Sequence, residues 1–118
     1  MKVMEAIERI DGLKPNALGP EMKIIWLYEA DVRLWDEIMR GSECAPERPE
    51  EYGRESELLL SVPDEEIYLA FLAAKIDFWN AEYARYNNDM LYFNALRDDF
   101  AARWNRDHRV KKNMPFRV

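Results

Sequence analysis

Two side chains that could act as nucleophiles or metal ligands occur once each in this 118-residue chain, Cys44 and His108. A structural zinc site needs about four nitrogen or sulfur ligands, which these two residues cannot supply. Cys44 stands in a glutamate-rich segment, where negative charge disfavours the reactive thiolate. Asp98 and Asp99 are adjacent, and neighbouring helical positions point about 100° apart, so they do not form an acid–base pair.

Other chemical signatures are also missing from the sequence. The four glycines are scattered at Gly12, Gly19, Gly41 and Gly53, so no glycine-rich phosphate loop is formed. A di-iron carboxylate bundle requires Glu-x-x-His on facing helices, and Asn105 stands three residues before the single histidine. We therefore expect no enzymatic activity, no metal and no cofactor.

The charge of the chain is unevenly distributed. Residues 103–118 carry six cationic side chains and one anionic one, a net charge of +5. Since the whole chain has a net charge of −6, residues 1–102 have a net charge of −11. An acidic body disfavours general nucleic-acid binding, which depends on neutralising phosphates. The basic end has two interpretations, a solvated terminus or a segment that reaches a neighbouring subunit or DNA.

Composition also bears on the setting of the protein. The length predicts one domain, which we place at residues 1–109, followed by a basic docking tail at 110–118. No apolar run reaches the roughly 18 residues of a membrane span, and the charged N-terminus does not resemble a signal peptide. A lone cysteine excludes an internal disulfide, and a cytoplasmic origin is the default expectation.

Residues 64–107 contain no glycine or proline, and large apolar side chains recur there at steps of three and four. This period predicts a helix. We favour a single long helix, straight or kinked, of ~66 Å, which would extend beyond its own domain and leave part of its apolar stripe for another chain. The alternative is a helical hairpin with its turn at Asn87 and Asn88, since asparagines also favour turns.

The remaining elements predict a small all-α bundle with a long acidic loop. Helices are expected at residues 3–10, with Gly12 following the end, and at 20–40, with Pro20 at the first position and Gly41 at the end. The loop spans residues 41–63. Within it, residues 57–61 are too apolar to remain in solvent, so we expect them to lie extended against the helices or to add a strand to a neighbour.

Asp31 interrupts the apolar stripe of the second predicted helix. A carboxylate there is either exposed at the edge of the stripe or buried with a partner. Lys75, a cation among apolar neighbours, is the candidate partner in the second case.

Candidate interface residues come from the aromatic and basic content of the chain. About half of the aromatic side chains between residues 79 and 104 are expected in the core, and the others exceed what such a core needs. Trp, Tyr and Arg are the usual anchors of protein interfaces. The predicted interface set is Leu58, Leu59, Leu60, Tyr68, Trp79, Arg85, Tyr92, Arg109, Lys111, Lys112, Met114 and Phe116.

Three segments carry a family resemblance. Residues 74–82 read Ala-Lys-Ile-Asp-Phe-Trp-Asn-Ala-Glu, residues 85–94 read Arg-Tyr-Asn-Asn-Asp-Met-Leu-Tyr-Phe-Asn, and Trp104-Asn105-Arg106 follows. With residues 7–18 and 58–63, this pattern resembles the head–tail connectors, also called adaptor or head-completion proteins, of tailed phages and prophages of Gram-positive bacteria. Ala81 replaces a glycine of that family, which predicts a straighter helix here.

The resemblance implies a non-catalytic structural protein of the virion, made in the host cytoplasm. Connectors of this family are small helical bundles that add to the portal vertex after DNA packaging. They form a ring of identical subunits that extends the portal channel, with passive contact to the packaged DNA, and receive the next neck protein. The basic tail is then expected to dock on a partner, and no membrane is involved.

Two rival hypotheses share the absence of chemistry. A small phage-encoded helical protein could bind and inhibit or regulate another protein, and it would be missing from purified virions. A nucleic-acid-binding module using the tail and the aromatic side chains would show an affinity that falls steeply with salt.

Overall fold

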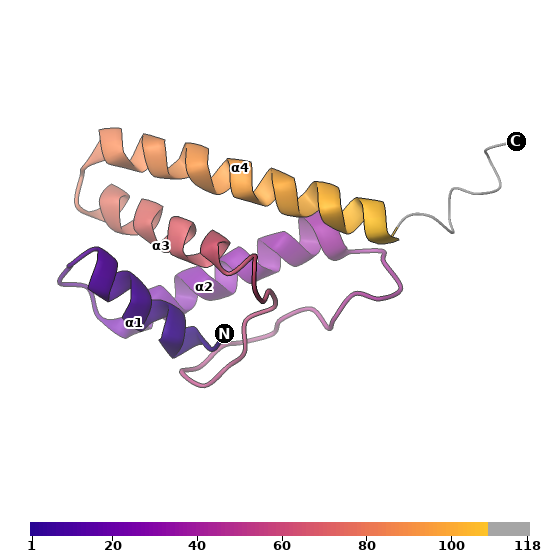
Figure 1. Cartoon of the computed structure of the whole chain (residues 1–118). Coiled ribbons are helices and arrows are strands. Elements are labelled where there is room, and N and C mark those ends of the chain that lie inside the picture. Colours follow the sequence, from indigo (N-terminus) through magenta and orange to yellow (C-terminus); the bar gives the residue numbers. More distant parts are fainter. Residues whose placement is uncertain (109–118) are drawn as a thin grey trace, which may run out of the picture.

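The computed structural model describes residues 1–108, and these form an all-helical protein, as predicted. Its elements are α1 (Val3–Leu13), α2 (Pro20–Leu34), the π-helix η1 (Trp35–Met39), α3 (Glu66–Trp79) and α4 (Tyr83–His108). Helices α3 and α4 run antiparallel as a hairpin, and α1 and α2 lie against the other side of α3 (Figure 1). The long loop follows the far side of α2. The described part of the chain contains no strand, only an isolated bridge between Lys2 and Glu57.

The first two helices begin and end close to the predicted positions. Pro20 occupies the start of α2 after an extended Gly19, and α2 continues directly into η1. Gly41 then adopts φ +88°, the left-handed conformation that ends a helix and favours glycine. The prediction for α1 was too short, because Gly12 lies inside the helix and the Lys14 N–H closes its end on the Ile10 carbonyl.

The prediction of one helix over residues 64–107 is wrong. Helix α3 ends at Trp79, and the chain reverses through Asn80, Ala81 and Glu82 before α4 begins. Ala81 has φ +59°, its N–H donates to the Phe78 carbonyl at 3.0 Å, and the Glu82 N–H donates to the Asp77 carbonyl at 2.8 Å.

The hairpin alternative was therefore right in kind but wrong in position, because Asn87 and Asn88 lie within α4. The alanine at position 81 does not straighten the helix. A left-handed non-glycine residue costs roughly 1–2 kcal/mol. Packing of α4 on α3 offsets this cost, as in the contact between the Phe71 and Phe93 rings, whose centroids are 5.2 Å apart.

Helix α3 forms the centre of the bundle. It is apolar on almost all sides, and nine of its fourteen residues are buried, which is typical of a helix surrounded by others. Helix α4 covers one side of it, yet only Phe93 and Phe100 of α4 are fully buried. The outer face of α4 is therefore available for contacts outside this chain.

The loop is held on the bundle by Asp31, which is completely buried. Its carboxylate accepts hydrogen bonds from the hydroxyls of Tyr52 (2.5 Å) and Tyr68 (2.6 Å) and from the backbone N–H of Leu59 (3.0 Å). The Tyr68 hydroxyl in turn accepts from the Leu60 N–H at 2.8 Å. Burial raises the pKa of Asp31, and burial beside this carboxyl group raises the pKa of both tyrosines.

Asp31 is therefore buried with partners, which confirms one of the two alternatives expected for it, but the expected partner is wrong. The residue is neither exposed nor paired with Lys75, whose ammonium lies 3.7 Å from Glu29 and 5.4 Å from the centre of the Phe71 ring. The partners of Asp31 are tyrosines because they supply donors without a second buried charge. Residues 57–61 lie against the helices, which confirms the first of the two arrangements expected for them.

Candidate interaction surface

The turn between α3 and α4 is secured by a buried carboxylate. Asp77, near the end of α3, accepts hydrogen bonds from the Lys14 ammonium at 3.0 Å to both of its oxygens. Although burial acts to raise its pKa, the bonds from Asp89 and Lys14 hold the pKa of Asp77 below its ordinary value. The hairpin is thereby tied to the segment that joins α1 and α2.

Asp89 of α4 faces the same carboxylate. Burial and the hydrogen bond with Asp77 raise the pKa of Asp89 to about 6. Its Oδ2 atom is buried and has no hydrogen-bond partner among the described residues. A proton on Asp89 satisfies this oxygen, because the neutral carboxyl group can donate to the ionised Asp77.

Replacing Asp89 by asparagine is expected to stabilise the protein at pH 8 by about 1 kcal/mol, because the amide keeps a donor and carries no charge. The folded protein holds the Asp89 proton up to a pKa of about 6, whereas the unfolded chain loses it near 3.8. The stability due to the protonated form is therefore complete below pH 3.8 and lost as the pH rises through 6. The gain should disappear at pH 4.

Urea unfolding of both proteins across this pH range measures the effect. Asp98→Asn, on the exposed side of α4, is the matched control and should show no such pH dependence. If D89N changed the free energy of unfolding equally at pH 4 and pH 8, a proton held between Asp89 and Asp77 would be excluded.

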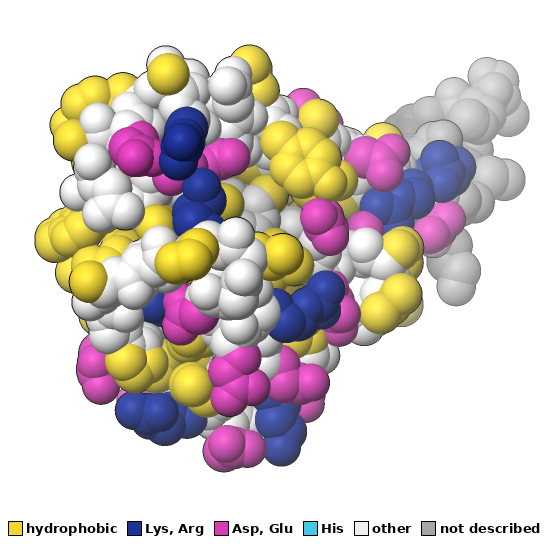
Figure 2. Space-filling view, turned by 60° about the vertical axis from the view of Figure 1, so that its left-hand side comes forward, with side chains coloured by type: hydrophobic (Ala, Val, Ile, Leu, Met, Phe, Trp, Pro, Cys, Tyr) yellow, Lys and Arg dark blue, Asp and Glu magenta, His cyan; other side chains and the backbone are white. Residues whose placement is uncertain are grey.

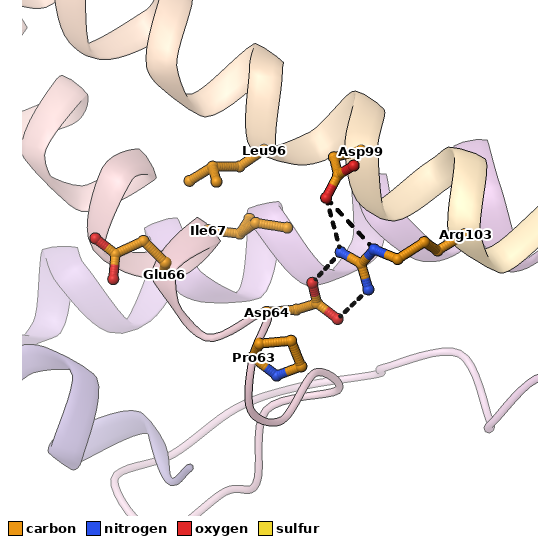
Figure 3. Close-up of a pocket in the computed structure, with 7 residues that line it drawn as sticks. All are labelled: Pro63, Asp64, Glu66, Ile67, Leu96, Asp99 and Arg103. Carbon is orange, nitrogen blue, oxygen red and sulfur yellow. Dashed lines mark hydrogen bonds and ion pairs between the residues drawn. The ribbon is translucent and has the colours of Figure 1, made fainter.

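The opposite end of the hairpin is clamped by Arg103 of α4. Its guanidinium contacts the carboxylate of Asp64, in the turn before α3, at 2.5 and 3.3 Å, and that of Asp99 at 3.3 Å (Figure 3). These contacts raise the pKa of Arg103, chiefly through the hydrogen bonds with Asp64. Arg97 of α4 forms a further ion pair with Glu37 of η1. Helix α4 is thus oriented along its length and presents a defined outer face.

Aromatic side chains gather on the surface around the hairpin turn. Phe78 and Trp79 at the end of α3 and Tyr83 at the start of α4 are each more than half exposed. The Phe78 ring contacts those of Tyr83 and Tyr86, at centroid distances of 5.7 and 5.1 Å. Figure 2, which brings this end of the molecule forward, shows hydrophobic side chains spread over the face between charged groups.

A second exposed apolar pair lies further along α4. Leu91 and Tyr92 are 70% and 49% exposed. We call these two residues together with Phe78, Trp79 and Tyr83 the hairpin surface, meaning the large apolar and aromatic side chains that the α3–α4 hairpin exposes. They are spread along the hairpin, since the Tyr92 hydroxyl donates to Glu66 at the start of α3 at 3.4 Å. Exposed aromatic side chains of this kind are typical anchors of protein interfaces.

The structure brings together some of the predicted interface residues and separates others. Trp79, Arg85 and Tyr92 are exposed on the hairpin, as an interface requires. Tyr68 has 0% exposure and cannot be an anchor, because its hydroxyl is needed to hold Asp31. The residues at 109–118, namely Arg109, Lys111, Lys112, Met114 and Phe116, lie outside the described part of the chain.

The leucines of the loop are not free for a partner. Leu58 and Leu60 are buried in the core, and Leu59 is half-buried. Conversely, sequence reasoning missed Phe78, Tyr83 and Leu91 as exposed side chains. Phe78 and Leu91 each precede a predicted anchor, Trp79 and Tyr92, and both members of each pair are exposed. The neighbouring anchor was therefore the available signal for Phe78 and Leu91.

Residues 1–108 lack two further features. No helix there is long and apolar enough to cross a membrane, and no group of three or more His, Cys, Asp or Glu side chains is placed to hold a metal ion. Comparison with known proteins gives no relationship to report: no family model, no curated protein and no solved structure matches the chain.

Proposed function

We propose that this protein is a head–tail connector of a tailed phage, which assembles as a ring on the portal vertex and joins the capsid to the tail. The observation that carries the proposal is the hairpin surface, which presents aromatic side chains on a rigid pair of helices. Two segments of the family resemblance lie on the same hairpin. Residues 74–82 form the end of α3 and the turn, and residues 85–94 form the first half of α4.

The structure gives physical roles to parts of this pattern. Asp77 and Asp89 secure the turn, and Phe93 packs against Phe71 in the core. Trp79 and Tyr92, by contrast, leave about half of their surface exposed. The pattern thus contains residues that stabilise the hairpin and residues that the hairpin exposes. This combination suits a protein whose hairpin contacts neighbouring subunits.

Shape and charge are also compatible with a ring subunit. The chain measures 57 × 31 × 20 Å along its principal axes. An elongated subunit that contacts its neighbours through different surfaces on its two sides generates a closed ring when the rotation is suitable. The acidic body would repel DNA phosphates, so that DNA could pass along a channel without being held.

The proposal is tested by mixing the purified protein with the portal protein encoded by the same genome and sedimenting the mixture. A connector co-sediments with the portal ring at near one-to-one subunit ratio. Deletion of residues 110–118 should leave the circular dichroism spectrum unchanged and abolish co-sedimentation. A folded protein that stays at the top of the gradient would contradict the portal position and favour a later neck position or a phage-encoded inhibitor, which purified virions would distinguish.

Substitutions on the hairpin surface should weaken association without unfolding the chain. Trp79→Ala combined with Tyr92→Ala is expected to reduce affinity between subunits by roughly tenfold, since exposed aromatic anchors dominate interface energy. Ile25→Ala, an exposed residue on α2, is the control. Sedimentation of the protein at increasing concentration measures the effect, and equal association of both variants would exclude this surface.

A further inference from the structure

The long loop forms a second surface of different character, an acidic groove beside α2. It has a volume of about 600 Å³. Its apolar part is built from Pro49, which is buried, and from Tyr52 and Leu59, which are half-buried, while Glu47, Glu50 and Glu51 line it with exposed carboxylates. We refer to these six residues as the acidic groove.

The backbone of the groove is held in place by the bundle. The Tyr28 hydroxyl of α2 donates to the Pro49 carbonyl at 3.4 Å, and the Tyr52 hydroxyl is bound to Asp31. Arg48 is turned toward Asp36, with which it forms two hydrogen bonds of 2.8 and 2.9 Å. The groove therefore has a fixed shape before any partner arrives.

Three of the carboxylates in the groove are not neutralised within residues 1–108. Arg48 and Glu57 also line the groove, but Arg48 is paired with Asp36 and Glu57 with the N-terminal ammonium of Met1. Arg54, the other cation of this stretch, lies 3.8 Å from Glu21. Glu47, Glu50 and Glu51 form no ion pair with another described residue. Three carboxylates beside an apolar strip favour a ligand that is both basic and apolar.

The segment at 109–118 has these two properties. It reads Arg-Val-Lys-Lys-Asn-Met-Pro-Phe-Arg-Val, with four cationic side chains and no anionic one. Its apolar residues Met114, Phe116 and Val118 alternate, so an extended conformation would place them on one side. Such a segment could set its apolar side chains on the strip and its cations against the glutamates.

The end of α4 lies within reach of the groove. Trp104, Asn105 and His108 form a pocket with Ile38 and Ser42, so the described chain ends where the loop begins. Ile38 lies ten helical residues after Tyr28, a distance of ~15 Å along the helix. Tyr28 contacts Pro49 of the groove, so the groove is about this far from the end of α4. Ten extended residues span up to ~33 Å, which is more than enough to run along the groove.

We propose that residues 109–118 dock in the acidic groove of their own chain. A segment tethered beside its site is present at an effective concentration of the order of millimolar, which favours the same chain over a second molecule. Docking shields the exposed carboxylates and covers Leu59 and Tyr52. It does not depend on the connector proposal, but any partner that binds this segment must first displace it from the groove.

The test uses the full chain and nuclear magnetic resonance. In Cys44→Ser combined with Glu55→Cys, the new thiol carries a nitroxide two residues before Glu57, which lines the groove together with Leu59. With the label oxidised, the amide signals of residues 116–118 should lose most of their intensity compared with the reduced label. Adding Glu50→Lys and Glu51→Lys should restore these signals, and so should high salt, since screening weakens contacts between exposed charges.

Two controls make the outcome decisive. Glu8→Lys with Glu82→Lys changes the charge equally on α1 and at the hairpin turn, and the signal loss should persist. A mixture of isotope-labelled Cys44→Ser protein with unlabelled, nitroxide-bearing protein should show no loss. Unchanged signals in the first experiment, loss that survives the groove substitutions, or loss in the mixed sample would each overturn docking within one chain.

Discussion

Replacing Asp31 by alanine is expected to lower the free energy of unfolding by about 3–5 kcal/mol, because it leaves buried donors without an acceptor. The hydroxyls of Tyr52 and Tyr68 and the N–H of Leu59 all donate to this carboxylate. Asp31 has 0% exposure, so a water molecule that took the place of its carboxylate would have to enter the core. Urea unfolding followed by circular dichroism gives the value.

Two companion variants separate this network from a general effect of substitution in α2. Glu29→Ala removes an exposed carboxylate whose nearest cation, Lys75, is 3.7 Å away, and should change stability by less than about 1 kcal/mol. Asp31→Asn keeps one acceptor oxygen and should fall between the two. If D31A were no less stable than E29A, the loop would not be anchored by this residue.

Loss of Asp31 should also release the loop before the bundle unfolds. Leu59 and Leu60 donate their N–H groups to Asp31 and Tyr68, respectively. In D31N, hydrogen exchange at these two amides is expected to accelerate more than exchange within α3, because local opening is governed by the contacts of the segment concerned.

Ala81→Gly is expected to stabilise the protein by about 1 kcal/mol, because glycine adopts positive φ without the steric penalty of a side chain. Ala95→Gly, in the middle of α4 and also exposed, should destabilise it by about 1 kcal/mol. The same substitution should therefore change the free energy of unfolding in opposite directions at two exposed alanines, with a difference of roughly 2 kcal/mol between the variants.

The pair distinguishes a hairpin from one continuous helix. In a continuous helix through residue 81, glycine would destabilise at both positions. Thermal or urea unfolding of the two variants measures the difference, and a loss of stability in A81G would contradict the φ of +59° at this residue.

The helical class could be read from the sequence because helix periodicity is local. Apolar steps of three and four indicated the helices, and Pro20 and Gly41 marked the ends of the second one, each through the conformation of a single residue. The apolar character of residues 57–61 similarly required burial, whatever covers them. None of these inferences depends on contacts between residues that are far apart in the sequence.

The turn at Ala81 was decided by tertiary packing. The apolar spacing continues through it without interruption, and asparagines nearby offered a more obvious turn at Asn87 and Asn88. The chain reverses earlier because Phe93 then packs on Phe71 and Lys14 reaches Asp77. These contacts join residues far apart in the sequence, so no local pattern could reveal them.

Burial of polar groups was likewise settled by the tertiary structure. The sequence by itself determined that a carboxylate interrupts the stripe of α2 and that aromatic side chains exceed the needs of a small core. Only the folded chain determined that Tyr68 serves Asp31 while Trp79 and Tyr92 face solvent. The physical reason is that a buried charge must find its donors wherever the fold brings them, here 21 and 37 residues away.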